Sequence, residues 1–139
     1  MRKIFLVSHG TLAKGVFEAA NMIYGDLKDV CYLGLEENMG IELFKEKLNE
    51  LINNSKDYNE IIVLADLKGG SPYTSAVTLL SQKELLNKSK VISGLNLPML
   101  LTTLFMENEL SEDDVEELIK AARDGIGKFE IEDEEDSDL

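Results

Sequence analysis

The histidine at position 9 is the only histidine in the chain, and it stands where a strand is expected to end. Residues 4–7 before it are apolar, and Ser8 and Gly10 flank it. An apolar run that stops at small residues is typical of a strand giving way to a loop. Imidazole is titratable and nucleophilic, so at such a position it can accept a proton or a transferred group. His9 is therefore the first candidate for chemistry.

The segment from Asp66 to Pro72 has the composition of an anion-binding turn. Gly69 and Gly70 permit a positive φ and a close approach of the backbone. Ser71 is a good N-terminal cap, and Pro72 suits the first helical position. Free N–H groups and a hydroxyl would then lie at the positive end of a helix, where anions bind. An ordinary strand-to-helix turn would use the same residues, and only a position next to the histidine favours the anion site.

Short apolar stretches alternate with amphipathic stretches along the chain. Strands are predicted at residues 3–8, 30–35, 61–65 and 90–93, and helices at 12–24, 41–53, 71–82, 98–107 and from Ser111 onward. This alternation indicates an α/β fold with an open, mainly parallel sheet and helices on both faces. In the common flavodoxin-like order 2-1-3-4, the first and third strands are neighbours, and ligands bind beyond their C-terminal ends. Because neighbouring strands lie about 4.8 Å apart, His9 is predicted to face Asp66.

A carboxylate that accepts one ring N–H of a histidine fixes its tautomer and leaves the other nitrogen as the nucleophile. Asp66 has a rival role, because an aspartate ending the third strand also accepts phosphoryl groups in receiver domains. Those domains hold magnesium with an acidic pair after the first strand, where this chain has Ser8-His9-Gly10. A hydrolase triad of Ser71, His9 and Asp66 stays open, although Ser71 lacks the Gly-x-Ser-x-Gly elbow.

Two other site types lack parts in this sequence. It contains no Gly-x-x-x-x-Gly-Lys-Ser/Thr loop for nucleotide phosphates. One histidine and one cysteine cannot supply a conventional zinc site, so no metal is predicted.

The formal net charge of −13 is unevenly distributed. Residues 130–139 contain seven acidic residues and no basic one, and without them the net charge is −6. We predict one domain over residues 1–131 and a disordered acidic tail over 132–139. This acidic surface disfavours nucleic acid and suits a partner with a basic face, although solubility alone would also explain the tail.

The single Cys31 is predicted to be buried. With no signal peptide and no apolar run of about 20 residues, a cytoplasmic protein is predicted.

Three motifs, in order, resemble the mannose/sorbose-family IIA component of the bacterial phosphoenolpyruvate-dependent sugar phosphotransferase system. They are Val7-Ser8-His9-Gly10, Asp66-Leu67-Lys68-Gly69-Gly70-Ser71-Pro72 and Gly94-Leu95-Asn96-Leu97-Pro98-Met99-Leu100. The resemblance implies a phosphotransferase without a cofactor, in which His9 accepts a phosphoryl group from the phosphocarrier protein HPr. A IIB component then takes the group and phosphorylates sugar that enters through the membrane subunits IIC and IID.

The same resemblance implies the roles of the residues around the histidine. Asp66 is its hydrogen-bond partner, and Ser71 donates to the phosphoryl oxygens. Gly69, Gly70 and Thr11 are predicted to complete the phosphoryl-binding site, with the N–H groups of Gly70 and Ser71 as helix N-terminal donors.

Family resemblance also implies a homodimer, in which a C-terminal strand, here residues 127–131, crosses antiparallel to the sheet edge of the partner. Asn96 and Pro98 would shape the loop and helix beside the site. Lys68 departs from the family, which often has an apolar or aromatic residue there. It could add positive charge near the phosphate or alter partner fit, and simple surface variation is the favoured explanation. The acidic end, in place of a linker into a fused IIB domain, implies a free-standing IIA.

Two alternative functions stay open. The phosphotransfer subunit of dihydroxyacetone kinase shares the fold and the histidine of the first strand. A regulatory module would instead use phosphorylation of His9 to switch binding to a partner. Neither the sugar nor the cognate IIB component is specified by the sequence.

Overall fold

The apolar runs of the sequence form one parallel sheet in the computed structural model, which describes residues 1–131. Its strands are β1 (Arg2–His9), β2 (Val30–Leu35), β3 (Glu60–Ala65) and β4 (Ser89–Ser93). The helices are α1 (Leu12–Tyr24), α2 (Ile41–Asn53), α3 (Ser71–Gln82), α4 (Leu97–Phe105) and α5 (Glu112–Asp124), with a short 3-10 helix η1 (Leu86–Lys88). The strand order β2-β1-β3-β4 confirms the predicted order 2-1-3-4.

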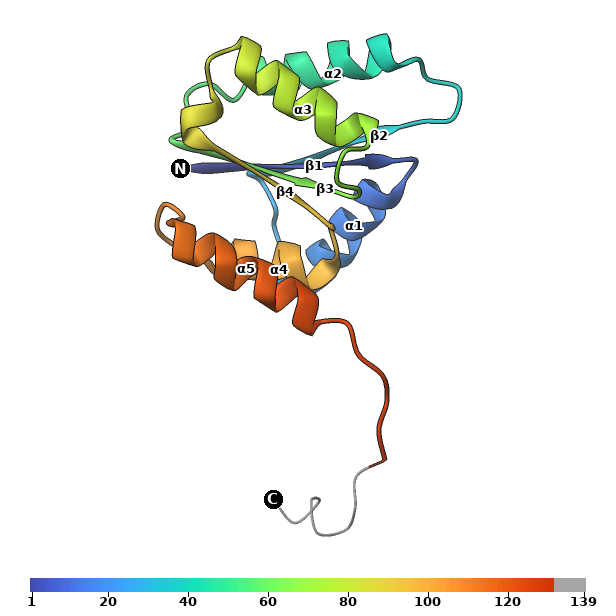
Figure 1. The fold of residues 1–139 in the computed structure, drawn as a ribbon, viewed down its shortest axis with the longest axis vertical. Coiled ribbons are helices and arrows are strands. Elements are labelled where there is room, and N and C mark those ends of the chain that lie inside the picture. Colours follow the sequence, from blue (N-terminus) through green and yellow to red (C-terminus); the bar gives the residue numbers. More distant parts are fainter. Residues whose placement is uncertain (132–139) are drawn as a thin grey trace.

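Helices cover both faces of the sheet, as the alternation of elements predicted. Figure 1 shows α2 and α3 on one face and α1, α4 and α5 on the other. Side chains of a strand alternate between faces, so β1 sends Phe5 and Val7 to the α2/α3 side and Ile4 and Leu6 to the opposite side. The central strand β3 is buried along its whole length, which explains the continuous apolar sequence of residues 61–65.

The parallel register brings the C-terminal ends of β1 and β3 to the same edge. Val7 pairs with Ala65, and His9 pairs with Leu35 of β2 on the other side. Every loop that follows a strand therefore emerges at this edge, and α1 and α3 both start there. This edge is the place where the predicted site residues can meet.

The C-terminal segment after α5 forms no strand within the described chain. Residues 126–131 form neither helix nor strand, and they extend away from the body of the protein (Figure 1). Phe129 and Ile131 are 90% and 89% exposed. A strand needs a partner for its backbone hydrogen bonds, and this segment pairs with no strand of the described chain. The antiparallel edge strand is thus not formed here, and the predicted tail at 132–139 lies outside the described residues.

Burial keeps the single cysteine out of the chemistry. Cys31 packs at the border of the core on the α2/α3 side. Burial raises the pKa of its thiol to about 11, against a weaker opposing effect of Lys3. The thiol is therefore protonated near neutral pH, where only a thiolate would act as a nucleophile.

A buried ion pair fastens the opposite edge of the sheet. The Nε atom of Arg2 donates to Glu60 at 2.8 Å, and the other oxygen of Glu60 accepts the N–H of Leu110 at 2.8 Å. The guanidinium also donates to three backbone carbonyls, that of Thr103 in the last turn of α4 and those of Met106 and Asn108 between α4 and α5. Helix α4 ends at Phe105, two residues before the predicted end, because Met106 turns into extended backbone.

Arg2→Ala is expected to destabilise the protein by about 3–5 kcal/mol, because it leaves the buried Glu60 carboxylate without its cation. Urea unfolding measures this loss. Lys14→Ala is the matched control, since Lys14 meets Glu18 only at 4.0 Å on the surface and such pairs contribute about 0–1 kcal/mol. Equal losses in the two variants would contradict the role of the buried pair.

Candidate active site

His9 and Asp66 meet at the C-terminal edge of the sheet, which confirms the predicted pairing. The Nδ1 atom of His9 lies 2.8 Å from Oδ2 of Asp66, and the backbone N–H of His9 donates to the same oxygen at 2.9 Å. The imidazole is 50% exposed and the carboxylate 11%. With Nδ1 donating to the carboxylate, Nε2 is the nitrogen that stays available to react.

The second carboxylate oxygen of Asp66 is an exception to ordinary pairing. Within the described part of the chain, Oδ1 is buried and has no hydrogen-bond partner. An unpaired buried acceptor costs free energy, and such groups in native proteins need an explanation in strain or function. In the described chain, the carboxylate accepts hydrogen bonds only from His9. This suits a group that orients the imidazole and stabilises positive charge on it.

Backbone hydrogen bonds hold the two residues at this edge. The N–H of Asp66 donates to the carbonyl of Val7 at 3.2 Å and extends the ladder between β1 and β3 by one residue. Gly10 turns the chain with a φ of +54°, and its N–H donates to the carbonyl of Leu35 at 2.8 Å. His9 therefore lies between Asp66 and Gly10, and backbone hydrogen bonds hold both of these residues in place.

Two positions that support this turn were missed by the sequence reasoning. Ser8 is fully buried, and its Oγ accepts the N–H of Ala13 at 2.8 Å in the first turn of α1. Gly34 of β2 faces the turn, and a Cβ there would lie 1.9 Å from the carbonyl oxygen of Gly10. A glycine inside a strand often marks such a close backbone approach, so that signal was present.

The glycine turn before α3 agrees with the prediction only in part. Gly69 has a φ of +79°, which confirms the predicted positive φ. Helix α3 has the predicted range, Ser71–Gln82, but its N-cap is Gly70 rather than Ser71, so Ser71 takes the first helical position and Pro72 the second. The N–H of Gly70 donates to the carbonyl of Leu67 at 3.1 Å. The prediction of a free donor at Gly70 is therefore wrong, because the turn itself uses that N–H.

Two helix N-termini remain beside the histidine. Ser71 begins α3, and its N–H has no partner within the helix, as in every first turn. Thr11 is the exposed N-cap of α1, two residues after His9. The positive ends of both helices favour an anion at this edge.

Lys68 belongs to a neighbouring groove. The groove has a volume of about 500 Å³, and Lys68, Tyr73, Asn96 and Arg123 are among its lining residues, which include neither His9 nor Asp66. Asn96 caps α4 by accepting the N–H of Met99 at 2.9 Å, and its amide donates to the carbonyl of Ala122 at 2.9 Å. Pro98 is in the first turn of α4, so both residues shape this loop as expected.

Metal and membrane features are not evident in residues 1–131. There, no three His, Cys, Asp or Glu side chains gather in a way that could hold a metal ion. No helix of the same range combines the length and the apolar character needed to cross a membrane.

A doubly wound parallel sheet places an aspartate-bound histidine at the reversal of strand order, and this arrangement is chemically suited to carry a group on imidazole. The family model described as "PTS system fructose IIA component" matches residues 3–122, and the chain belongs to this family of the phosphotransferase system (PTS). The chain is thus a phosphoryl carrier of the sugar phosphotransferase system, a phosphotransferase that works through a phosphohistidine.

Individual relatives agree with this assignment. The chain is 25% identical to the fructose-specific EIIA component of Bacillus subtilis (strain 168), over 87% of this chain and 81% of that protein. It is 30% identical to the sorbose-specific EIIA component of Lacticaseibacillus casei, over 78% and 76%. It spans only 38% of the mannose-specific EIIAB component of Escherichia coli (strain K12), at 28% identity over 88% of this chain.

Solved structures support the fold. The EIIA component from Streptococcus agalactiae superposes with a TM-score of 0.76 at 31% identity, covering 92% of this chain and 97% of that one. The mannose/sorbose-specific IIA subunit from Enterococcus faecalis gives a TM-score of 0.83 at 24% identity, covering 95% and 97%.

Proposed function

We propose that His9 carries the phosphoryl group, accepting it on Nε2 from phosphorylated HPr and passing it to a IIB component for coupled sugar uptake. The contact between Nδ1 of His9 and Asp66, at 2.8 Å on the only histidine of the chain, is the observation that carries the proposal. The half-exposed ring supports it further, because the donor is the side chain of another protein and must reach Nε2.

The transfer exchanges one phosphorus–nitrogen bond for another. The lone pair of Nε2 attacks the phosphorus atom in line, and the bond between phosphorus and the histidine nitrogen of HPr breaks. The electron pair of that bond stays with the HPr imidazole. The proton on Nδ1 of His9 stays between the ring and Asp66, whose carboxylate stabilises the positive charge that the ring gains.

The surrounding groups act by position and charge. Ser71 supplies a hydroxyl and an N–H at the start of α3 for the phosphoryl oxygens. Gly69 permits the turn that brings this helix end near the ring, and Thr11 at the start of α1 completes the site. Donors that are already oriented stabilise charge as it spreads over the transferring oxygens.

The decisive experiment supplies the protein with labelled phosphoenolpyruvate, enzyme I and HPr. One phosphoryl group per chain is expected in an acid-labile linkage, and a cognate IIB component should remove it. A chain that stays unlabelled while another IIA protein is labelled in parallel would contradict the proposal. Transfer to the nucleotide-bearing subunit of dihydroxyacetone kinase instead of IIB would favour that alternative. A label that neither acceptor removes would favour a regulatory module.

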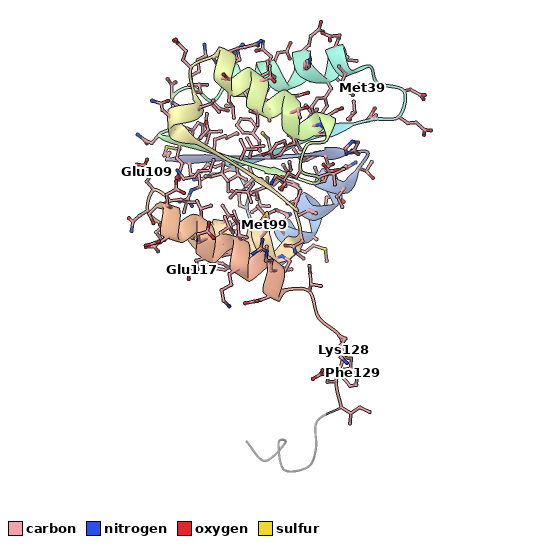
Figure 2. The ribbon with its side chains drawn as sticks, viewed as in Figure 1. Met39, Met99, Glu109, Glu117, Lys128 and Phe129 are labelled. Carbon is pink, nitrogen blue, oxygen red and sulfur yellow. The ribbon has the colours of Figure 1, made fainter. Side chains whose placement is uncertain are left out.

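We also propose that two chains form a homodimer by exchanging residues 127–131 as antiparallel edge strands. The outer edge of β4 has no neighbouring strand in the described chain, and residues 127–131 are extended and exposed. Phe129 and Ile131 alternate with the charged Lys128 and Glu130, as in a strand with one buried face. Figure 2 shows Lys128 and Phe129 well away from the sheet of their own chain.

We propose further that this protein meets HPr and the IIB component in the cytoplasm.

Phe129→Asp is expected to convert the dimer into a monomer, because it places a charge on the apolar face of the exchanged strand. Sedimentation at several concentrations measures the change. Lys128→Asp adds a carboxylate on the opposite face of the same segment and should leave the dimer intact. A wild-type protein that sediments as a monomer would contradict the proposal.

A further inference from the structure

We propose that Gly70 positions the His9 imidazole, by leaving room for its Cε1 edge to pack against the backbone that begins α3. This inference rests on the proposed function, in which His9 carries the phosphoryl group. A Cβ at Gly70 would lie 3.0 Å from Cε1 of His9, closer than side-chain carbons ordinarily pack. The ring therefore occupies the space that a side chain at position 70 would need.

The backbone of Gly70 does not require glycine for its own sake. Its φ of −71° and ψ of 166° are open to any residue. The adjacent Gly69 is the opposite case, because its φ is +79° and a Cβ there would meet no atom within 4 Å. Two consecutive glycines thus serve different purposes, one for the turn and one for the close approach of the ring.

Backbone hydrogen bonds hold Gly70 in place beside the ring. Its N–H donates to the carbonyl of Leu67 at 3.1 Å, and its own carbonyl accepts the N–H of Thr74 at 2.9 Å in α3. These hydrogen bonds tie the residue to the turn on one side and to the helix on the other. A Cβ added at Gly70 would also approach the carbonyl of Leu67 at 3.3 Å, so the ring is the neighbour that can move most easily.

The contact is placed to control the direction of Nε2. In an imidazole, Cε1 lies between the two nitrogens. Asp66 holds the ring at Nδ1, and the missing side chain of Gly70 leaves Cε1 the room that this orientation needs. The hydrogen bond and the free space together set the rotation of the ring about its bond to Cβ. They aim Nε2 while leaving it exposed to the phosphoryl donor.

Gly70→Ala is expected to shift or rotate the ring by a few tenths of an ångström and to bend its hydrogen bond with Asp66. Because small misplacements of a reacting group slow transfer steeply, phosphorylation by HPr should be about tenfold slower. The measurement is the single-turnover rate with phosphorylated HPr. Gly15→Ala is the matched control, since Gly15 lies in α1 with no atom within 4 Å of a Cβ position. Its rate should equal that of the wild type.

A second readout separates positioning of the ring from obstruction of the donor. Imidazole ¹⁵N resonances of unphosphorylated protein report the tautomer and the hydrogen bond at Nδ1. They should change in Gly70→Ala and stay unchanged in Gly15→Ala, while both variants melt as cooperative folded proteins. Gly70→Ser adds the same Cβ and should move the resonances in the same direction.

Two results would overturn the proposal. One is wild-type resonances together with a wild-type rate in Gly70→Ala. The other is slow transfer with unchanged resonances, which would mean that the methyl group only obstructs the donor. Failure of the proposed function looks different, because the wild-type protein itself would then take no label on His9.

Discussion

His9→Gln is expected to accept no measurable phosphoryl group from phosphorylated HPr, a loss of at least about 10³-fold in rate. The amide of glutamine is a poor nucleophile, and the chain contains no second histidine to replace the first. The fold should survive, because the ring is half exposed and lies at the edge of the sheet, away from the apolar core. Incorporation of labelled phosphate and the melting temperature are measured on the same preparation.

The control for this variant is Lys14→Gln, an exposed substitution on α1 close to the same sheet edge. It should be labelled like the wild type. Acid-labile label at wild-type levels in His9→Gln would show that another residue carries the group. That result would remove the proposed role of His9, although membership of the family would stand.

Asp66→Asn is expected to slow phosphorylation of His9 by about 10- to 100-fold without unfolding the protein. The amide oxygen can replace Oδ2 and still accept both N–H groups of His9. The new amino group then takes the buried place of Oδ1, where the described chain offers no partner. The main loss is the negative charge. A hydrogen bond to a charged group contributes about 1.5–3 kcal/mol, and 1.36 kcal/mol corresponds to one factor of ten.

Single-turnover transfer from HPr measures this loss. Asp124→Asn is the matched control, because it removes the same charge from an exposed pair with Lys120 on α5. That control should transfer at the wild-type rate. If Asp66→Asn also transfers at the wild-type rate, the carboxylate only holds the backbone of His9 in place and does not stabilise the charged ring.

The order and extent of the elements could be predicted because their signals are local. The apolar run of β3 and the amphipathic period of α1 are contained within 6 and 13 residues. Apolar residues at every third or fourth position indicate a helix with one apolar face, and a short continuous apolar run bounded by turn residues indicates a buried strand. The pairing of His9 with Asp66 could be predicted from two further regularities. Parallel strands end at the same edge of a sheet, and in the common strand order the first and third strands are neighbours.

The details of the anion site could not be predicted in the same way. The motif correctly indicated a turn with positive φ at Gly69 and a helix starting beside it. It misassigned the N–H of Gly70, because the partner of a backbone donor depends on how the turn closes in space. Here the carbonyl of Leu67 takes that donor.

The sequence by itself thus determined which side chains the protein brings to the edge of its sheet. The periodicity and the ends of the strands depend on residues that are close together in the chain. Only the tertiary structure decided how these side chains contact one another. The approach of Gly70 to the His9 ring and that of Gly34 to Gly10 join segments far apart in the chain. Such distances depend on the path of the backbone between them, and residue types alone do not specify that path.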